Sequence, residues 1–256
     1  MTSLRTPESH PERQSDNAIV LDHVSVRYRL SVEPRLSLKE AIVRFNRRRW
    51  RDFAALTDIS LTIRAGEVLG IVGMNGAGKT TLLNLLARVI DVSTGRLRIR
   101  GKVSQLIDLM SGFHPDLTGR ENSYVRGALL GLTRTEMNER MPGIEAFAAI
   151  GEFFDAPLRS YSAGMILRVA FAVATTVDAD ILLIDEALAV GDAEFQRKCE
   201  ARIAEFRTRG VTFVVASHYL QQLLQICDRV AWIEAGRIRQ LGAPRDVITA
   251  YIAAHT

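Results

Sequence analysis

The chain has 256 residues, 47% of them hydrophobic, which is enough to bury the core of one large α/β domain or of a domain with a small subdomain. Its net charge of +4 suits a surface that faces anionic lipid or nucleic acid, but a value this small selects no partner. The two cysteines are scattered and form no Cys-x-x-Cys pattern, which indicates a reducing compartment and argues against a thiolate metal site. The polar N-terminus has no apolar signal region, and no run approaches the roughly 18 apolar residues of a membrane span. We therefore expect a cytoplasmic protein that reaches a membrane only through a partner.

The first quarter of the chain predicts a tail, two strands and an unusual segment between them. We expect residues 1–17 to be a disordered tail and residues 18–243 to form the main domain. Residues 19–28 and 55–63 alternate between apolar and polar side chains, which predicts two strands. The intervening segment 29–53 does not continue this pattern. Leu38, Ile42 and Phe45 in it share one face of a short predicted helix.

A basic cluster at residues 47–51, which includes Trp50, follows that predicted helix. A basic cluster with a tryptophan beside an amphipathic helix suits a membrane surface or a membrane partner. A solvated basic loop is the alternative interpretation.

Strands and helices alternate over most of the remaining chain. We expect strands at 67–72, 96–100, 103–109, 181–184 and 211–216, helices at 81–87, 165–177, 193–207 and 220–226, a hairpin at 230–240, and a closing helix at 244–254 within a C-terminal segment 244–256. From residue 111 to 158 the pattern is helical with breaks at Pro115, Pro142 and Pro157, and we interpret residues 111–168 as an inserted helical subdomain. Alternation of buried strands with helices predicts an α/β fold with a largely parallel sheet.

A glycine-rich stretch carries the clearest chemistry. It has the form G-x-x-x-x-G-K-T and lies between a buried strand and a helix start. Glycines let backbone N–H groups turn toward phosphate oxygens, and the helix N-terminus adds positive potential. The lysine can reach the β- and γ-phosphates, and the threonine hydroxyl can bind Mg²⁺. The predicted phosphate-binding residues are Gly73, Met74, Asn75, Gly76, Ala77, Gly78, Lys79, Thr80 and Thr81.

Polar residues follow two of the predicted buried strands. Asp185 and Glu186 come directly after an apolar run, at the carboxyl end where phosphate loops also open. Asp185 can hold Mg²⁺ together with Thr80, and Glu186 can orient and deprotonate an attacking water. His218 follows the next strand, and from there it could reach a γ-phosphate.

Ser162 stands before another helix and predicts a second anion site at a helix N-terminus. One chain needs only one cradle for a γ-phosphate. A head-to-tail dimer, in which the second cradle completes the partner's site, is a natural solution.

With this feature the chain resembles the ATP-binding subunit of ABC transporters over residues 18–243. The stretch 161–165 resembles the family's signature, and the resemblance implies that Ser162 and Gly164 contact the γ-phosphate across the dimer. It also implies that Asp192 belongs to the loop that crosses the interface and that His218 is the switch histidine. Tyr28 corresponds to the aromatic residue that stacks on adenine, with Phe53 as its competitor.

The implied fold is a P-loop NTPase with a parallel RecA-like core, a small antiparallel β subdomain and the inserted helical subdomain. The implied cofactors are ATP and Mg²⁺. One departure from the family is Leu109, which stands where a glutamine usually meets Mg²⁺, while the nearest glutamine, Gln105, falls in a predicted strand.

Four parts of the sequence are similar to the corresponding parts of ATPases that export O-antigen, capsular or teichoic-acid polysaccharides. They are residues 112–122, residues 189–196, the signature and the extra segment 29–53. This branch implies a homodimer on an integral membrane permease, peripheral at the cytoplasmic face of the inner membrane, that exports lipid-linked polysaccharide without binding nucleic acid. Many members carry a C-terminal carbohydrate-binding domain, and because the sequence stops at Thr256 we expect that polymer-end recognition is not done here. The alternatives are an exporter of another substrate, such as a lipid or a drug, and a non-transport ABC protein acting on ribosomes or nucleic acid.

Overall fold

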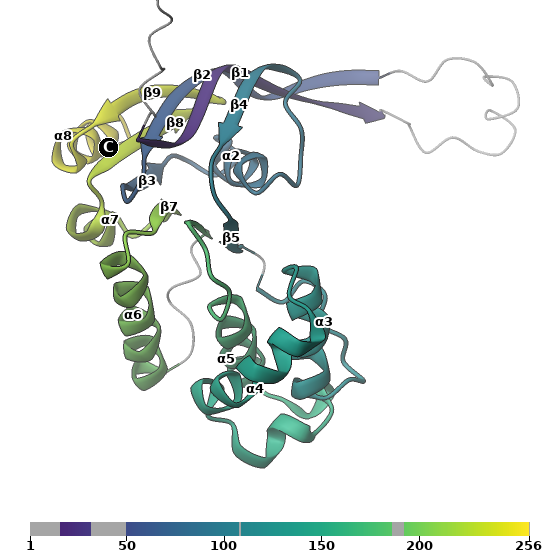
Figure 1. Ribbon diagram of the computed structural model, residues 1–256. Coiled ribbons are helices and arrows are strands. Elements are labelled where there is room, and N and C mark those ends of the chain that lie inside the picture. Colours follow the sequence, from purple (N-terminus) through teal and green to yellow (C-terminus); the bar gives the residue numbers. More distant parts are fainter. Residues whose placement is uncertain (1–15, 32–49, 108, 186–191, 256) are drawn as a thin grey trace, which may run out of the picture.

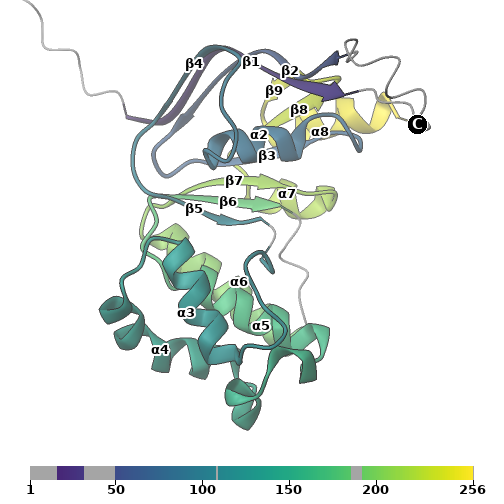
Figure 2. The ribbon, with the colours of Figure 1, turned by 90° about the vertical axis from the view of Figure 1, so that its right-hand side faces the viewer.

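The computed structural model describes residues 16–31, 50–107, 109–185 and 192–255. Two sheets with a helix between them make an upper lobe, and a group of helices makes a lower lobe (Figures 1 and 2). Of the predicted tail, residues 1–15 lie outside the described part of the chain.

The smaller sheet is antiparallel and has the strand order β2-β1-β4. Its strands are β1 (Asn17–Ser31), β2 (Trp50–Arg64) and β4 (Thr94–Ile99). Residues 29–31 and 50–52, expected in the inserted segment, pair with each other, and Phe53 of that segment pairs with Tyr28, so the β1–β2 hairpin is longer than expected. The helix predicted at 37–45 and residues 47–49 of the basic cluster lie outside the described residues.

The larger sheet has the order β5-β6-β7-β3-β8-β9, in which only β9 is antiparallel to its neighbour. Every residue of the central strands β3 and β7 is buried, as expected for parallel strands covered on both faces. Strand β5 ends at Leu106, where its pairing with β6 ends, and not at Leu109 as the apolar run suggested. The strands are β3 (Val68–Val72), β5 (Val103–Leu106), β6 (Ile181–Asp185), β7 (Thr212–Ala216), β8 (Arg229–Glu234) and β9 (Arg237–Gly242).

Alternate residues of the larger sheet enter two different hydrophobic cores. On one face Leu183 and Val214 pack with α2 (Lys79–Leu86) and with the inner face of the small sheet. On the other face Leu182 and Phe213 pack with α5 (Ala163–Ala174), α6 (Ala193–Thr208), α7 (Leu220–Ile226) and α8 (Pro244–Ala253). Helix α2 is therefore held between the two sheets, as Figure 2 shows.

The lower lobe contains α3 (Gly119–Leu129), α4 (Arg134–Ala148) and the 3-10 turns η1 (Gly151–Asp155) and η2 (Leu158–Ser160), packed around α5. Helix α5 contributes to the core of both lobes, and the rings of Phe113 and Phe147 also pack against both.

The break predicted at Pro142 is wrong, because Pro142 lies inside α4. An interior proline removes one helix hydrogen bond and costs about 3 kcal/mol. The buried residues Met137, Met141, Ile144 and Ala148 recur at helical spacing and keep the helix continuous against the lobe's core.

Helix α7 begins and ends as predicted, and α5 begins two residues earlier than expected, at Ala163. In the described part of the chain, no helix combines the length and apolar character that crossing a membrane requires.

Candidate nucleotide site

The predicted phosphate loop lies between a fully buried strand and a helix. Strand β3 leads into Gly73, and α2 begins at Lys79. Lys79 is only 7% exposed, and its Nζ donates to the carbonyl oxygens of Gly73 at 2.7 Å and Met74 at 3.2 Å. The ammonium group is thus held across the loop, close to where phosphate oxygens bind in such loops.

Two glycines of the loop are required by the backbone. A Cβ at Gly73 would lie 2.3 Å from the carbonyl oxygen of Ile233. Gly78, the N-cap of α2, has φ +113°, and a Cβ there would lie 2.9 Å from the carbonyl oxygen of Ala55. No side-chain hydrogen bond caps the N-terminus of α2, and such a helix start suits an anion.

The back of the loop is supported by residues that the sequence did not single out. The N–H of Gly236, in the β8–β9 turn, donates to the carbonyl of Ala77 at 2.9 Å, and the N–H of Thr57 donates to the carbonyl of Gly236 at 2.8 Å. The turn at 235–236 was predictable, but its place against a loop about 160 residues earlier had no local signal.

The predicted metal residues are in contact. Thr80 Oγ1 donates to Asp185 Oδ2 at 3.2 Å, so a hydroxyl and a carboxylate meet beside the phosphate loop. These are hard oxygen donors of the kind Mg²⁺ prefers, and the residues present therefore fit this ion.

The carboxyl ends of three strands converge here. Asp185 is paired with Ala216 of β7, and Ile71 of β3 is paired with the same residue. Ser217 and the exposed His218 follow directly. Glu186 lies outside the described residues, although its neighbour Asp185 is at this edge.

The two aromatic candidates for adenine stacking are cross-strand partners, because Tyr28 of β1 pairs with Phe53 of β2. Directly opposite residues share a face of the sheet. Phe53 is 52% exposed, whereas Tyr28 packs partly against the core. Phe53 is also two residues from Ala55, whose carbonyl oxygen lies close to Gly78, so the strand that carries Phe53 reaches the loop.

The signature region begins α5 in the lower lobe, while the phosphate loop begins α2 in the upper lobe (Figure 2). Ser162 is the N-cap of α5, and its Oγ accepts the N–H of Met165 at 3.2 Å. A Cβ built on Gly164 would meet only Ser162 Oγ, at 3.9 Å, so no residue that the structure describes requires glycine there.

Asp192 is the N-cap of α6, and Arg168 of α5 forms an ion pair with it at 2.5 Å. Arg168 was not expected from the sequence. Leu109 is 5% exposed in the core beneath the larger sheet, and Gln105 lies in β5 as expected. The position at which the resemblance places the family's glutamine is therefore held by a buried apolar side chain.

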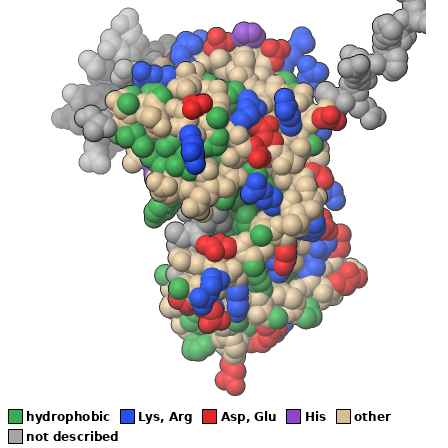
Figure 3. Space-filling model, turned by 90° about the vertical axis from the view of Figure 1, so that its left-hand side faces the viewer, with side chains coloured by type: hydrophobic (Ala, Val, Ile, Leu, Met, Phe, Trp, Pro, Cys, Tyr) green, Lys and Arg blue, Asp and Glu red, His purple; other side chains and the backbone are tan. Residues whose placement is uncertain are grey.

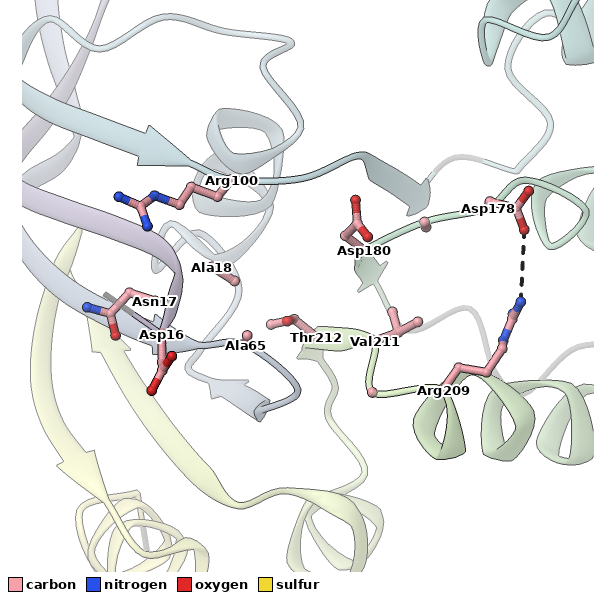
Figure 4. A pocket seen from close by; sticks show the side chains of 12 residues that line it. Asp16, Asn17, Ala18, Ala65, Arg100, Asp178, Asp180, Arg209, Val211 and Thr212 are labelled. Atoms are coloured by element: carbon pink, nitrogen blue, oxygen red, sulfur yellow. Dashed lines mark ion pairs between the residues drawn. The ribbon is translucent and has the colours of Figure 1, made fainter. Parts of the chain in front are cut away.

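Two hollows border other parts of the fold. A small one of about 170 Å³ lies between the outer side of the phosphate loop and β8, where the hydroxyl of Tyr251 in α8 is 3.5 Å from Met74 Sδ. A groove of about 350 Å³ lies at the opposite, amino edge of the sheet (Figure 4). There Arg209 is 3.9 Å from Asp178, and Asp180 accepts the N–H of Lys102, so protein partners already engage these side chains. Nucleotides bind at the carboxyl edge of such sheets, so this groove is not the nucleotide site.

A glycine-rich loop beside a hydroxyl–carboxylate pair, at the carboxyl edge of a parallel sheet, defines a P-loop nucleotide-binding protein. The sequence matches the ABC transporter family over residues 56–189. The chain belongs to this family, and the predicted fold and family resemblance are confirmed.

Within this family, the sequence is similar to ATP-binding proteins of polysaccharide exporters. The chain is 45% identical over 245 residues to the O-antigen export system ATP-binding protein RfbB of Myxococcus xanthus, covering 93% of this chain and 56% of that protein. It is 43% identical over 237 residues to RfbB of Klebsiella pneumoniae, covering 91% and 96%. It is 40% identical over 233 residues to the teichoic acids export ATP-binding protein TagH of Shouchella clausii, covering 91% and 64%.

Among solved structures, a dimeric ATP-binding cassette in a post-hydrolysis state, bound to ADP and Pi, is similar with a TM-score of 0.69 at 21% identity. The match covers 89% of this chain and 99% of that one. At this identity the likeness concerns the fold.

Proposed function

We propose that the chain is the ATP-hydrolysing subunit of an ABC transporter that exports lipid-linked polysaccharide of O-antigen, capsule or teichoic acid type. The proposed ATP hydrolysis is supported mainly by the contact between Thr80 and Asp185, which lies beside the phosphate loop that Lys79 spans. The substrate class is supported by the relatives named above, which are O-antigen and teichoic acid export proteins.

The phosphates of ATP bind to the N–H groups of residues 73–81 and to Lys79. The Lys79 ammonium has three donors and donates to the carbonyl oxygens of Gly73 and Met74, which hold it at the loop where it meets phosphate oxygens. Thr80 and Asp185 would hold Mg²⁺, which supplies positive charge to the β- and γ-phosphates when bound. Leu109 provides no ligand, since its side chain is apolar and buried.

Turnover requires a base and a contact to the γ-phosphate. Glu186, next to Asp185, orients and deprotonates the attacking water. His218 is exposed two residues after Ala216, the β7 residue that pairs with Asp185, and it contacts the γ-phosphate. Tyr28 stacks on adenine, with Phe53 as the competing ring.

The second half of each site comes from a second copy of the chain. Gly164 has open space where a side chain would be, at the N-terminus of α5 next to its cap Ser162. A phosphate bound to the partner fits there, between Ser162 and Gly164. Asp192 lies near the same interface. Closure of the dimer on ATP, and reopening after hydrolysis, then moves the two lower lobes.

A membrane permease receives that motion, with this subunit peripheral at the cytoplasmic face of the membrane. Met110, Val125 and Leu129 are exposed apolar side chains. Val125 and Leu129 are four residues apart on α3, and a Cβ at Gly112, in the loop that leaves β5, would lie 2.6 Å from Leu129 Cδ1. Such a patch fits a cytoplasmic helix of a permease. The segment 29–53 is a second candidate contact.

Two rival functions are less well supported. An exporter of another lipid or of a drug would share the ATPase site but not the similarity to polysaccharide exporters. A non-transport protein on ribosomes or nucleic acid would use a basic surface. On the face shown in Figure 3, however, acidic and basic side chains are interspersed.

Replacing the native gene by the Glu186→Gln form tests the proposal. We expect ATP to bind while turnover is nearly lost, surface glycan to disappear, and lipid-linked glycan to accumulate in the cytoplasm. Full ATP turnover would contradict the site assignment. Normal surface glycan with lost turnover would contradict the substrate class alone.

A further inference from the structure

Arg168 contacts three residues on two other helices from its position on α5, six residues after Ser162. Its Nη2 lies 2.5 Å from Asp192 Oδ2, its guanidinium lies 4.8 Å above the ring of Phe195, and its Nη1 is 3.5 Å from the carbonyl oxygen of Ala148. The side chain is 18% exposed. Guanidinium groups held by a carboxylate and an aromatic face keep a fixed orientation.

The two carboxylate oxygens of Asp192 accept hydrogen bonds from two different helices, α6 and α5. Oδ1 accepts the N–H groups of Glu194 at 3.1 Å and Phe195 at 2.9 Å, which caps α6, and Oδ2 accepts from Arg168 of α5. The N–H of Phe195 and the guanidinium of Arg168 hold the pKa of the Asp192 carboxyl below its usual value. The carboxylate therefore ties the signature helix to the start of α6.

The Arg168–Asp192 ion pair is close in sequence to the nucleotide site. Asp185 is bound to Thr80 at 3.2 Å, and only residues 186–191 separate Asp185 from Asp192 in the sequence. A displacement of α5 that keeps this ion pair moves Asp192, which lies seven residues after Asp185 in the sequence.

We propose that Arg168 is a positioning residue that couples the signature helix to the catalytic edge of the same chain. The inference rests on the proposed function, in which Ser162 engages the partner's nucleotide. When α5 responds to that nucleotide, the Arg168–Asp192 pair carries the response toward Asp185. Arg168 itself touches no substrate.

The coupling predicts a loss of turnover without a loss of ATP affinity. In Arg168→Gln we expect kcat to fall about tenfold or more, since misplacing a catalytic group by about 1 Å costs on the order of 100-fold. We expect the Kd for ATP, measured by equilibrium dialysis, to change less than about twofold. Arg168→Lys keeps a charge but not the planar fork, and should lose less.

Asp192→Asn is the second variant, because an amide oxygen can still cap α6 while the ion pair is lost. If the two residues act as one unit, the double variant loses no more than the worse single variant. A product of two independent losses would overturn the proposal, as would an unchanged kcat in Arg168→Gln.

Arg120 offers a matched control. It lies on α3, forms ion pairs with Asp155 at 2.7 Å and Glu145 at 3.0 Å, and stacks over Phe154 at 5.0 Å. Arg120→Gln should lower the melting temperature and leave kcat unchanged. An equal loss of kcat in this control would assign the effect of Arg168 to general loosening and overturn the coupling. If the wild-type chain hydrolyses no ATP, the proposed function fails before the coupling is tested.

Discussion

Adding one methyl group to Gly164 should stabilise the chain and at the same time impair it. Gly164 is the second residue of α5, and a Cβ there would meet only Ser162 Oγ, at 3.9 Å. Replacing a helical glycine by alanine without a clash stabilises by about 0.5 to 1 kcal/mol. For a chain of this size we expect the melting temperature to rise by roughly 2–4 °C per kcal/mol.

The same methyl group would occupy the space that we assign to the partner's γ-phosphate. Removing one hydrogen-bond donor from an oxyanion hole costs on the order of 100-fold in turnover, and we expect a loss of that order here. We therefore expect Gly164→Ala to melt higher than the wild type and to lose most of its ATPase activity. The two assays are thermal unfolding and steady-state phosphate release on the same preparation.

Gly143 provides the control for the stability half. It lies inside α4, and a Cβ there would have nothing within 4 Å. Gly143→Ala should raise the melting temperature similarly and leave turnover untouched. Full turnover in Gly164→Ala would refute the role of this space, and a loss of turnover in Gly143→Ala would show that the assay does not discriminate.

Three further predictions concern the loop, a surface pair and the thiols. Gly73→Ala places a Cβ 2.3 Å from a backbone carbonyl oxygen of β8, so ATP binding, measured by dialysis, should be lost. The hydrogen bond and charge of Asp58 raise the pKa of His23. The wild type should therefore melt at a higher temperature than His23→Gln, with the full difference below pH 6.5 and no difference once the pH has risen through the raised pKa. A difference in melting temperature that persists at about pH 9 would contradict this. Burial raises the pKa of Cys199 and Cys227 to about 12, so both thiols should resist iodoacetamide at pH 8 until the chain is unfolded, as mass spectrometry would reveal.

Short sequence patterns predicted most of the features that depend on neighbouring residues in the chain. The boundaries of α7 and the buried strand that ends at Asp185 follow from apolar spacing, and the phosphate loop follows from its glycines. The contact between Thr80 and Asp185 was predictable because both residues follow core strands of one parallel sheet.

What the sequence did not predict depends on contacts between distant residues. The break expected at Pro142 was overridden by burial of one face of α4. The support of the loop by Gly236 and the pairing of Arg168 with Asp192 involve turns and side chains that have no distinctive local pattern. The roles of Tyr28 and Gly164 stay predictions, because a nucleotide and a second chain are needed to test them.

The strand order of the larger sheet has a consequence for the synthesis of the chain. Strand β3, which leads into the phosphate loop, is synthesised early. Its neighbours in the sheet are β7 and β8, which end at Ala216 and Glu234. Chains grow from the N-terminus, so β3 has no partner in its own sheet until most of the 256 residues are made. A nascent or truncated chain that lacks β8 and the turn at Gly236 therefore cannot complete the loop. Incomplete subunits would compete poorly with finished ones for ATP.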